Sequence, residues 1–96
     1  MKKGCIYLVQ PDLLLGTNRY KVGISESVKY NRVSNYGKKR RTLCIFEDID
    51  DVKKLEKIVI SIFNKVFKKI NRHEYFEGNE CTMIKILSDE VIKYKY

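Results

Sequence analysis

The chain has few of the residues that build metal centres and disulfide scaffolds. Its 96 residues include three cysteines, one histidine, one proline and no tryptophan. The cysteines, Cys5, Cys44 and Cys81, lie far apart and form no Cys-x-x-Cys pair, which argues against a structural zinc site and against a disulfide framework. We therefore expect free thiols in a reducing compartment, with Cys5 and Cys44 packed as small hydrophobic side chains.

Long apolar runs and secretion signals are also missing. The longest apolar run, Ile58–Phe63, is interrupted by Ser61, whereas a membrane-spanning helix needs about 18–20 apolar residues. The apolar segment Cys5–Val9 is too short for a signal peptide. We expect a soluble, intracellular protein without membrane association. The absence of alanine beside abundant Lys, Ile, Asn and Tyr is typical of an A/T-rich coding sequence, which favours a viral, phage or A/T-rich bacterial origin.

What is present is enough for one basic, folded domain. Hydrophobic residues make up 44% of the chain, and the net charge is +8. Residues 1–48 carry ten basic and four acidic side chains, so the excess of positive charge lies in the first half. Such an excess favours a polyanionic partner, and DNA is the partner we expect. The candidate DNA-binding residues are the basic run Lys38, Lys39, Arg40 and Arg41. The alternative interpretation is that this run is only a solvated loop.

The hydrophobic periodicity predicts a single small α/β domain, residues 1–96, with a three-stranded, mainly antiparallel sheet flanked by three helices. Alternation along the first strand places Ile6 and Leu8 on one face and Cys5, Tyr7 and Val9 on the other. Asn79 is a suitable N-cap for the last helix. The predicted strands are Gly4–Gln10, Arg19–Ser25 and Thr42–Phe46, and Glu74–Phe76 is predicted to be a short extended segment. The predicted helices are a short one ending at Tyr36, a long one from Val52 to Ile70 and a C-terminal one over about 79–95.

Three residues could take part in catalysis or ligand binding, and each also has a simpler structural explanation. Glu56 falls inside the apolar arc of the long helix, where a carboxylate must be protonated, ion-paired or bound to a cation. Arg32 lies between Val28 and Tyr36 at helical spacing and offers a planar fork suited to phosphate. Tyr7 lies in the middle of the first strand. The alternatives are a structural ion pair for Glu56, a surface arginine and a core tyrosine.

The order of these segments resembles the GIY-YIG nuclease superfamily. In that family a first strand ends in Ile-Tyr, a second carries Tyr-Ile-Gly, and an Arg helix and a Glu helix follow. The resemblance covers about residues 4–78. It is closest to a phage- and virus-associated branch with Lys-Ile-Gly in the second strand and a later Glu-Tyr-Phe, which is described as a DNA-binding domain. The matching segments are Gly4–Tyr7, Tyr20–Ser25, Arg32–Tyr36, Leu55–Glu56 and Glu74–Phe76.

The resemblance implies a role for each matching position. Glu56 would bind one divalent ion, Mg²⁺ or Mn²⁺, Arg32 would grip the scissile phosphate, and Tyr7 would be the general base or orient the attacking water. Lys21 replaces the second tyrosine of the motif and could supply the positive charge that a phenol needs to act as a base near neutral pH. The accessory candidates are Tyr20, Tyr36, Asn71 and His73. A lone histidine in a polar segment, such as His73, is more often a surface residue than a catalytic one.

These roles predict a metal-dependent endonuclease domain that binds DNA and hydrolyses its phosphodiester bonds. A catalytically silent DNA-binding module of the same fold is the first alternative, because Lys21 replaces a motif tyrosine and the customary asparagine has only Asn71 as a candidate. A protein-interaction factor with an acidic partner is the second alternative. Without an appended recognition module, a protein partner could supply the specificity.

Overall fold

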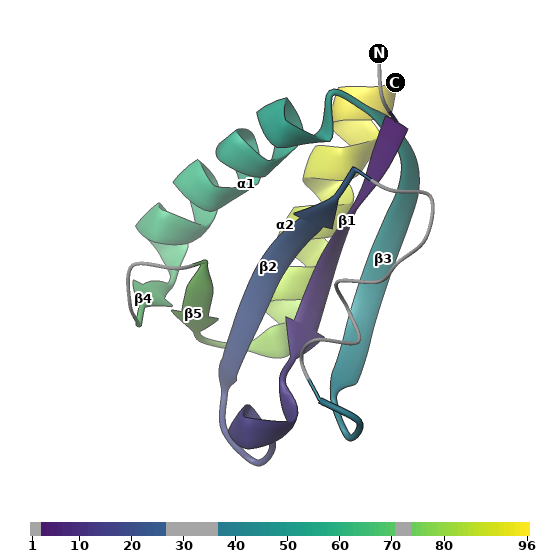
Figure 1. Ribbon diagram of the computed structural model, residues 1–96. Coiled ribbons are helices and arrows are strands. Elements are labelled where there is room, and N and C mark those ends of the chain that lie inside the picture. Colours follow the sequence, from purple (N-terminus) through teal and green to yellow (C-terminus); the bar gives the residue numbers. More distant parts are fainter. Residues whose placement is uncertain (1–2, 27–36, 71–73) are drawn as a thin grey trace.

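Five strands and two α-helices make up the part of the chain described by the computed structural model, residues 3–26, 37–70 and 74–96. The strands form one antiparallel sheet in the order β3-β1-β2-β5-β4 (Figure 1). The elements are β1 (Lys3–Gln10), the 3-10 turn η1 (Asp12–Leu14), β2 (Arg19–Ser25), β3 (Arg41–Asp50), α1 (Val52–Val66), β4 (Lys68–Lys69), β5 (Tyr75–Glu77) and α2 (Glu80–Lys95).

The prediction of three strands and three helices is wrong. The sheet gains β4, whose two residues are too few to show a hydrophobic period. It also gains β5, with three residues, where the sequence predicted a short extended segment at Glu74–Phe76. β3 runs to Asp50, beyond the predicted end at Phe46. The described residues contain two α-helices, and the predicted helix that ends at Tyr36 lies, beyond Glu26, outside the described ranges.

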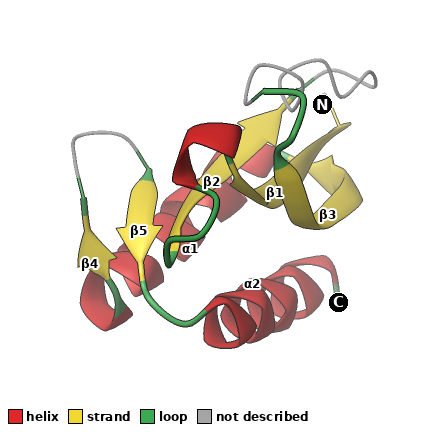
Figure 2. Ribbon diagram, turned by 90° about the horizontal axis from the view of Figure 1, so that it is seen from below, coloured by secondary structure: helices red, strands yellow, loops and turns green. Residues whose placement is uncertain are grey.

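The main core lies on one face of the sheet, between the strands and both helices. Ile6 and Leu8 face this core, whereas Cys5, Tyr7 and Val9 form a separate cluster on the other face, as the alternation predicts. In Figure 2, α2 runs beneath β1 and β3. β1 is buried from Gly4 to Gln10 because it is central in the sheet and covered on both faces. The helices contribute Val52, Leu55, Val59 and Phe63 from α1 and Met83, Leu87 and Val91 from α2.

The ends of α1 differ from the sequence prediction. The helix ends at Val66 rather than Ile70, because Phe67 is extended and Lys68–Lys69 pair with β5. Asp51 is its N-cap in the left-handed region, with φ 49° and no side-chain capping hydrogen bond. Asp48 also adopts the left-handed region, with φ 55°, inside β3. By contrast, α2 starts as predicted, since the Asn79 side chain accepts a hydrogen bond from the Thr82 N–H at 3.0 Å.

One edge of β2 is only partly covered by its neighbour. β5 pairs with β2 through Arg19, Tyr20 and Lys21, and within the described ranges no strand pairs with this edge beyond that point. α1 passes beside the same edge (Figure 1). The uncovered end of β2 and the first turns of α1 therefore face each other, and this is where the candidate site forms.

Candidate functional site

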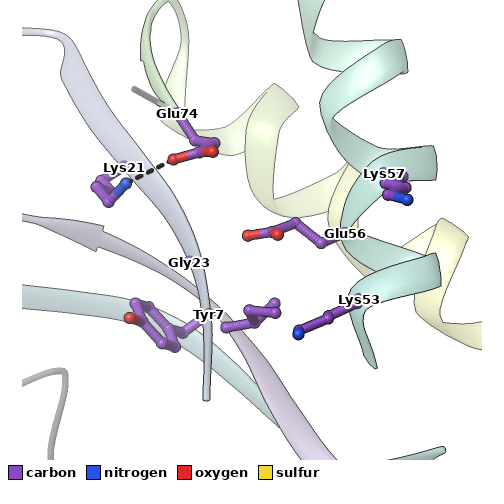
Figure 3. A pocket seen from close by; sticks show the side chains of 8 residues that line it. Tyr7, Lys21, Gly23, Lys53, Glu56, Lys57 and Glu74 are labelled. Atoms are coloured by element: carbon purple, nitrogen blue, oxygen red, sulfur yellow. Dashed lines mark hydrogen bonds and ion pairs between the residues drawn. The ribbon is translucent and has the colours of Figure 1, made fainter. Parts of the chain in front are cut away.

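A pocket of about 330 Å³ lies between β2 and α1. Three of the four residues predicted to be catalytic line it: Tyr7 from β1, Lys21 from β2 and Glu56 from α1 (Figure 3). These side chains come from three elements that are distant in the sequence. The fourth residue, Arg32, lies outside the described residues, as do the accessory candidates Tyr36, Asn71 and His73.

Tyr7 reaches the pocket across Gly23. The two residues are paired in the antiparallel ladder of β1 and β2, and the Tyr7 ring covers the glycine so closely that a Cβ there would lie 2.6 Å from the phenol oxygen. Only 1% of Tyr7 is exposed. Because Gly23 has no side chain, the phenol can extend over β2 toward its uncovered edge.

Lys21 is held at the pocket wall by Glu74, just before β5. Its Nζ lies 2.9 Å from Oε2 of Glu74 and 5.0 Å from the centroid of the Tyr75 ring. The main chain fixes the same corner, since the Val22 N–H donates to the Glu74 carbonyl at 3.0 Å. The Lys21 side chain is 14% exposed and that of Glu74 38%. This ammonium group is thus largely withdrawn from water and compensated by a carboxylate.

Glu56 is half-buried and points from α1 toward β2 (Figure 3). It stands at the edge of the apolar arc that includes Val52 and Val59, so its carboxylate faces the pocket rather than bulk solvent. Glu74 lines the pocket from the opposite side. The pocket therefore holds two carboxylates, and it receives positive charge from both the sheet and the helix.

Two further lysines, which no sequence motif indicated, stand near Glu56 on α1. Lys53 and Lys57 line the pocket, and Lys53 extends toward β2 (Figure 3). Lys53 also pairs with Glu26 at 3.4 Å. The i−3 and i+1 positions relative to Glu56 could have indicated them, once the side of α1 that faces β2 was known. Glu74 was noticed only as part of the Glu-Tyr-Phe segment, without a role.

No residue of the predicted basic loop lines this pocket. The loop leads into the start of β3. Arg41 forms two hydrogen bonds to Glu80, at 3.1 and 3.2 Å, and one to Gln10 at 3.0 Å. Arg40 donates to the carbonyl of Gly37 at 2.9 Å. Lys38 and Lys39 are exposed.

Tyr20, an accessory candidate, lies on the other face of β2 from Lys21. It is buried in the main core. Burial and the neighbouring Glu80 carboxylate raise the pKa of its phenol, and Arg41 opposes this effect. The structure thus separates Tyr20 from the phenol of Tyr7, which belongs to the opposite face.

Within the described ranges, no group of three or more His, Cys, Asp and Glu side chains forms a metal-binding cluster. In the same part of the chain, no helix is both long and apolar enough to cross a membrane. The three cysteines are free thiols. Cys5 is buried, as predicted, while Cys44 is half-buried and Cys81 exposed.

The fold and the pocket define a small α/β domain with a two-carboxylate, lysine-lined site at a sheet edge. The sequence model of the T5orf172 domain family matches residues 4–91, and the chain belongs to this family. It is a phage-associated family linked in general with nuclease and DNA-binding functions. No curated protein and no solved structure matches the chain.

Proposed function

We propose that this domain binds DNA and hydrolyses a phosphodiester bond in the pocket between β2 and α1. The observation that carries the proposal is the convergence of Tyr7, Lys21 and Glu56 on that pocket. Their similarity to the GIY-YIG nuclease motif supports the same assignment. Hydrolysis requires an activated water and positive charge near the phosphate, and these side chains can supply both.

Glu56 is the residue that would hold a divalent ion. Mg²⁺ is commonly bound by one or two carboxylates and keeps several water ligands, which fits a half-buried carboxylate that faces a pocket. When bound, Mg²⁺ or Mn²⁺ would act as a Lewis acid toward the phosphate and lower the pKa of a bound water. Glu74, across the pocket, could provide a second carboxylate.

Tyr7 would orient the attacking water or accept its proton. The water oxygen would then bond to phosphorus while the bond to the leaving oxygen breaks. An unperturbed phenol has a pKa of about 10, so it needs neighbouring positive charge to act as a base near neutral pH. Lys21 lies on the same face of the sheet as Tyr7, on the adjacent strand, and lines the same pocket, so its ammonium group could provide this charge. Arg32 would grip the scissile phosphate, as the resemblance implies.

A catalytically silent DNA-binding module is the second candidate. The observation in its favour is the ion pair between Lys21 and Glu74, because it offsets the positive charge at the position of the missing motif tyrosine. In this case the pocket would bind a phosphate without activating water.

Cleavage of duplex DNA in the presence of Mg²⁺ or Mn²⁺ tests the proposal. Glu56→Gln and Tyr7→Phe should abolish cleavage and retain DNA binding. Glu77→Gln is the matched control, because Glu77 pairs with Arg19 and does not line the pocket; it should retain both. If the wild-type protein binds DNA but does not cleave it with either ion, the silent module is the correct function.

A further inference from the structure

Of the two helices, α1 with the adjoining β4 carries the larger excess of positive charge. Residues 52–70 contain six lysines and one acidic residue, Glu56. By contrast, α2 (Glu80–Lys95) has three lysines and three acidic residues. Residues 41–51 have one basic and four acidic residues. Of the two helices, α1 is therefore the one suited to a polyanion.

Four exposed polar residues on α1 stand in one row. Lys53, Lys57, Ser61 and Lys65 follow each other at i+4 spacing, which places them on the same side of the helix. Within the described ranges, neither Lys57 nor Lys65 forms an ion pair, so both ammonium groups are available to a ligand. Lysine binds phosphate as a compact point charge, and serine hydroxyls also contact DNA phosphates.

A groove of about 570 Å³ follows this row. Its walls include Ser61, Asn64 and Lys65, and it shares Glu56, Lys57 and Glu74 with the candidate catalytic pocket. The two hollows are therefore adjacent, and together they extend along α1. From Lys53 to Lys65 the helix rises about 18 Å, which corresponds to about five nucleotides of one strand of B-form DNA.

We infer that one DNA strand lies along this row, with its phosphates on Lys53, Lys57 and Lys65 and one phosphate at the pocket. The inference rests on the proposed DNA-binding function and specifies the surface that carries it. An acidic protein segment would meet the same lysines. DNA is favoured because the row leads directly into the pocket and because the family is associated with DNA.

The test compares two double variants that remove the same charge from exposed lysines. One is Lys57→Ala with Lys65→Ala; the control is Lys85→Ala with Lys93→Ala on α2, two side chains that are each 76% exposed and line neither hollow. Binding of a fluorescent duplex is measured in EDTA over a series of salt concentrations, so that cleavage plays no part. The α1 variant should lower the slope of log K against log salt by about 1.8, because each phosphate contact contributes about 0.9. The α2 variant should leave the slope unchanged.

The remaining outcomes separate this inference from the proposed function. If the wild-type protein does not bind DNA even at low salt, the proposed function fails. If it binds but the α1 variant keeps the full slope, or if both variants lose the same amount, only the inference fails. Polyglutamate that binds as tightly as DNA at the same salt would instead assign the row to an acidic protein. Thermal melting verifies that the variants fold; if the double variant does not, Lys57→Gln and Lys65→Gln singly should each lower the slope by about 0.9.

Discussion

The ring of Tyr7 lies against the backbone of Gly23, and a Cβ at position 23 would stand 2.6 Å from its Cε1, Cζ and hydroxyl oxygen. The two residues are paired across β1 and β2, and the ring is almost completely buried. The glycine is required here for close approach. This contact positions the phenol at the edge of the sheet that opens into the pocket.

Gly23→Ala should destabilise the protein by about 1–3 kcal/mol, because an added methyl group in a packed site forces the ring to move. Urea unfolding measures the change. In a Tyr7→Val background the ring is absent, so the same substitution should cost much less, with a coupling energy of about 0.5–3 kcal/mol. Equal costs in the two backgrounds would show that the contact with Tyr7 is not the cause.

Removing Glu74 from its ion pair with Lys21 should lower the stability of the protein more than removing Lys21. Glu74→Gln leaves a lysine that is only 14% exposed without its carboxylate, whereas Lys21→Met leaves a more exposed carboxylate and an apolar side chain in the buried position. We expect a loss of about 1–3 kcal/mol for Glu74→Gln and less than about 1 kcal/mol for Lys21→Met. Urea unfolding measures both. A larger loss for Lys21→Met would contradict the assigned burial of the ammonium group.

The three thiols should differ strongly in reactivity. Burial raises the pKa of Cys44 to about 11 and also raises that of Cys5, while Cys81 is exposed on α2. At pH 8, about one Cys44 side chain in a thousand is therefore a thiolate, since pH lies about three units below its pKa. Alkylation should modify one cysteine rapidly, and Cys81→Ser should remove this fast phase. The rate at Cys44 should rise about tenfold per pH unit up to pH 10. Two fast cysteines in the folded protein at pH 8 would contradict this prediction.

Long periodic segments were predictable from the sequence, and short or tertiary ones were not. The alternation along β1 fixed which face Tyr7 occupies, because a strand has a strict period of two. β4, with Lys68 and Lys69, has no period to detect, and the sequence predicted these two lysines inside the long helix from Val52 to Ile70. The left-handed conformation of Asp51 separates β3 from α1, and no hydrophobic period indicates it.

The site was predictable only where a motif described it. Tyr7, Lys21 and Glu56 match positions of a known pattern, so their convergence could be expected. Lys53 and Glu74 join them only because α1 packs beside the uncovered end of β2, where β5 stops. That arrangement depends on strand register and helix placement, which one sequence without aligned relatives does not specify.

The most direct test of the account is whether Mg²⁺ binds at Glu56, measured by thermal melting with and without the ion at matched ionic strength. A site on Glu56 predicts that Mg²⁺ at ten times its Kd stabilises the wild-type protein by about 1.4 kcal/mol, or roughly 5–10 °C for a domain of this size. Glu56→Gln should abolish that shift. A wild-type protein insensitive to Mg²⁺, together with a Glu56→Gln variant destabilised by about 1–3 kcal/mol, would make Glu56 a structural ion-pair partner and contradict the metal-dependent nuclease.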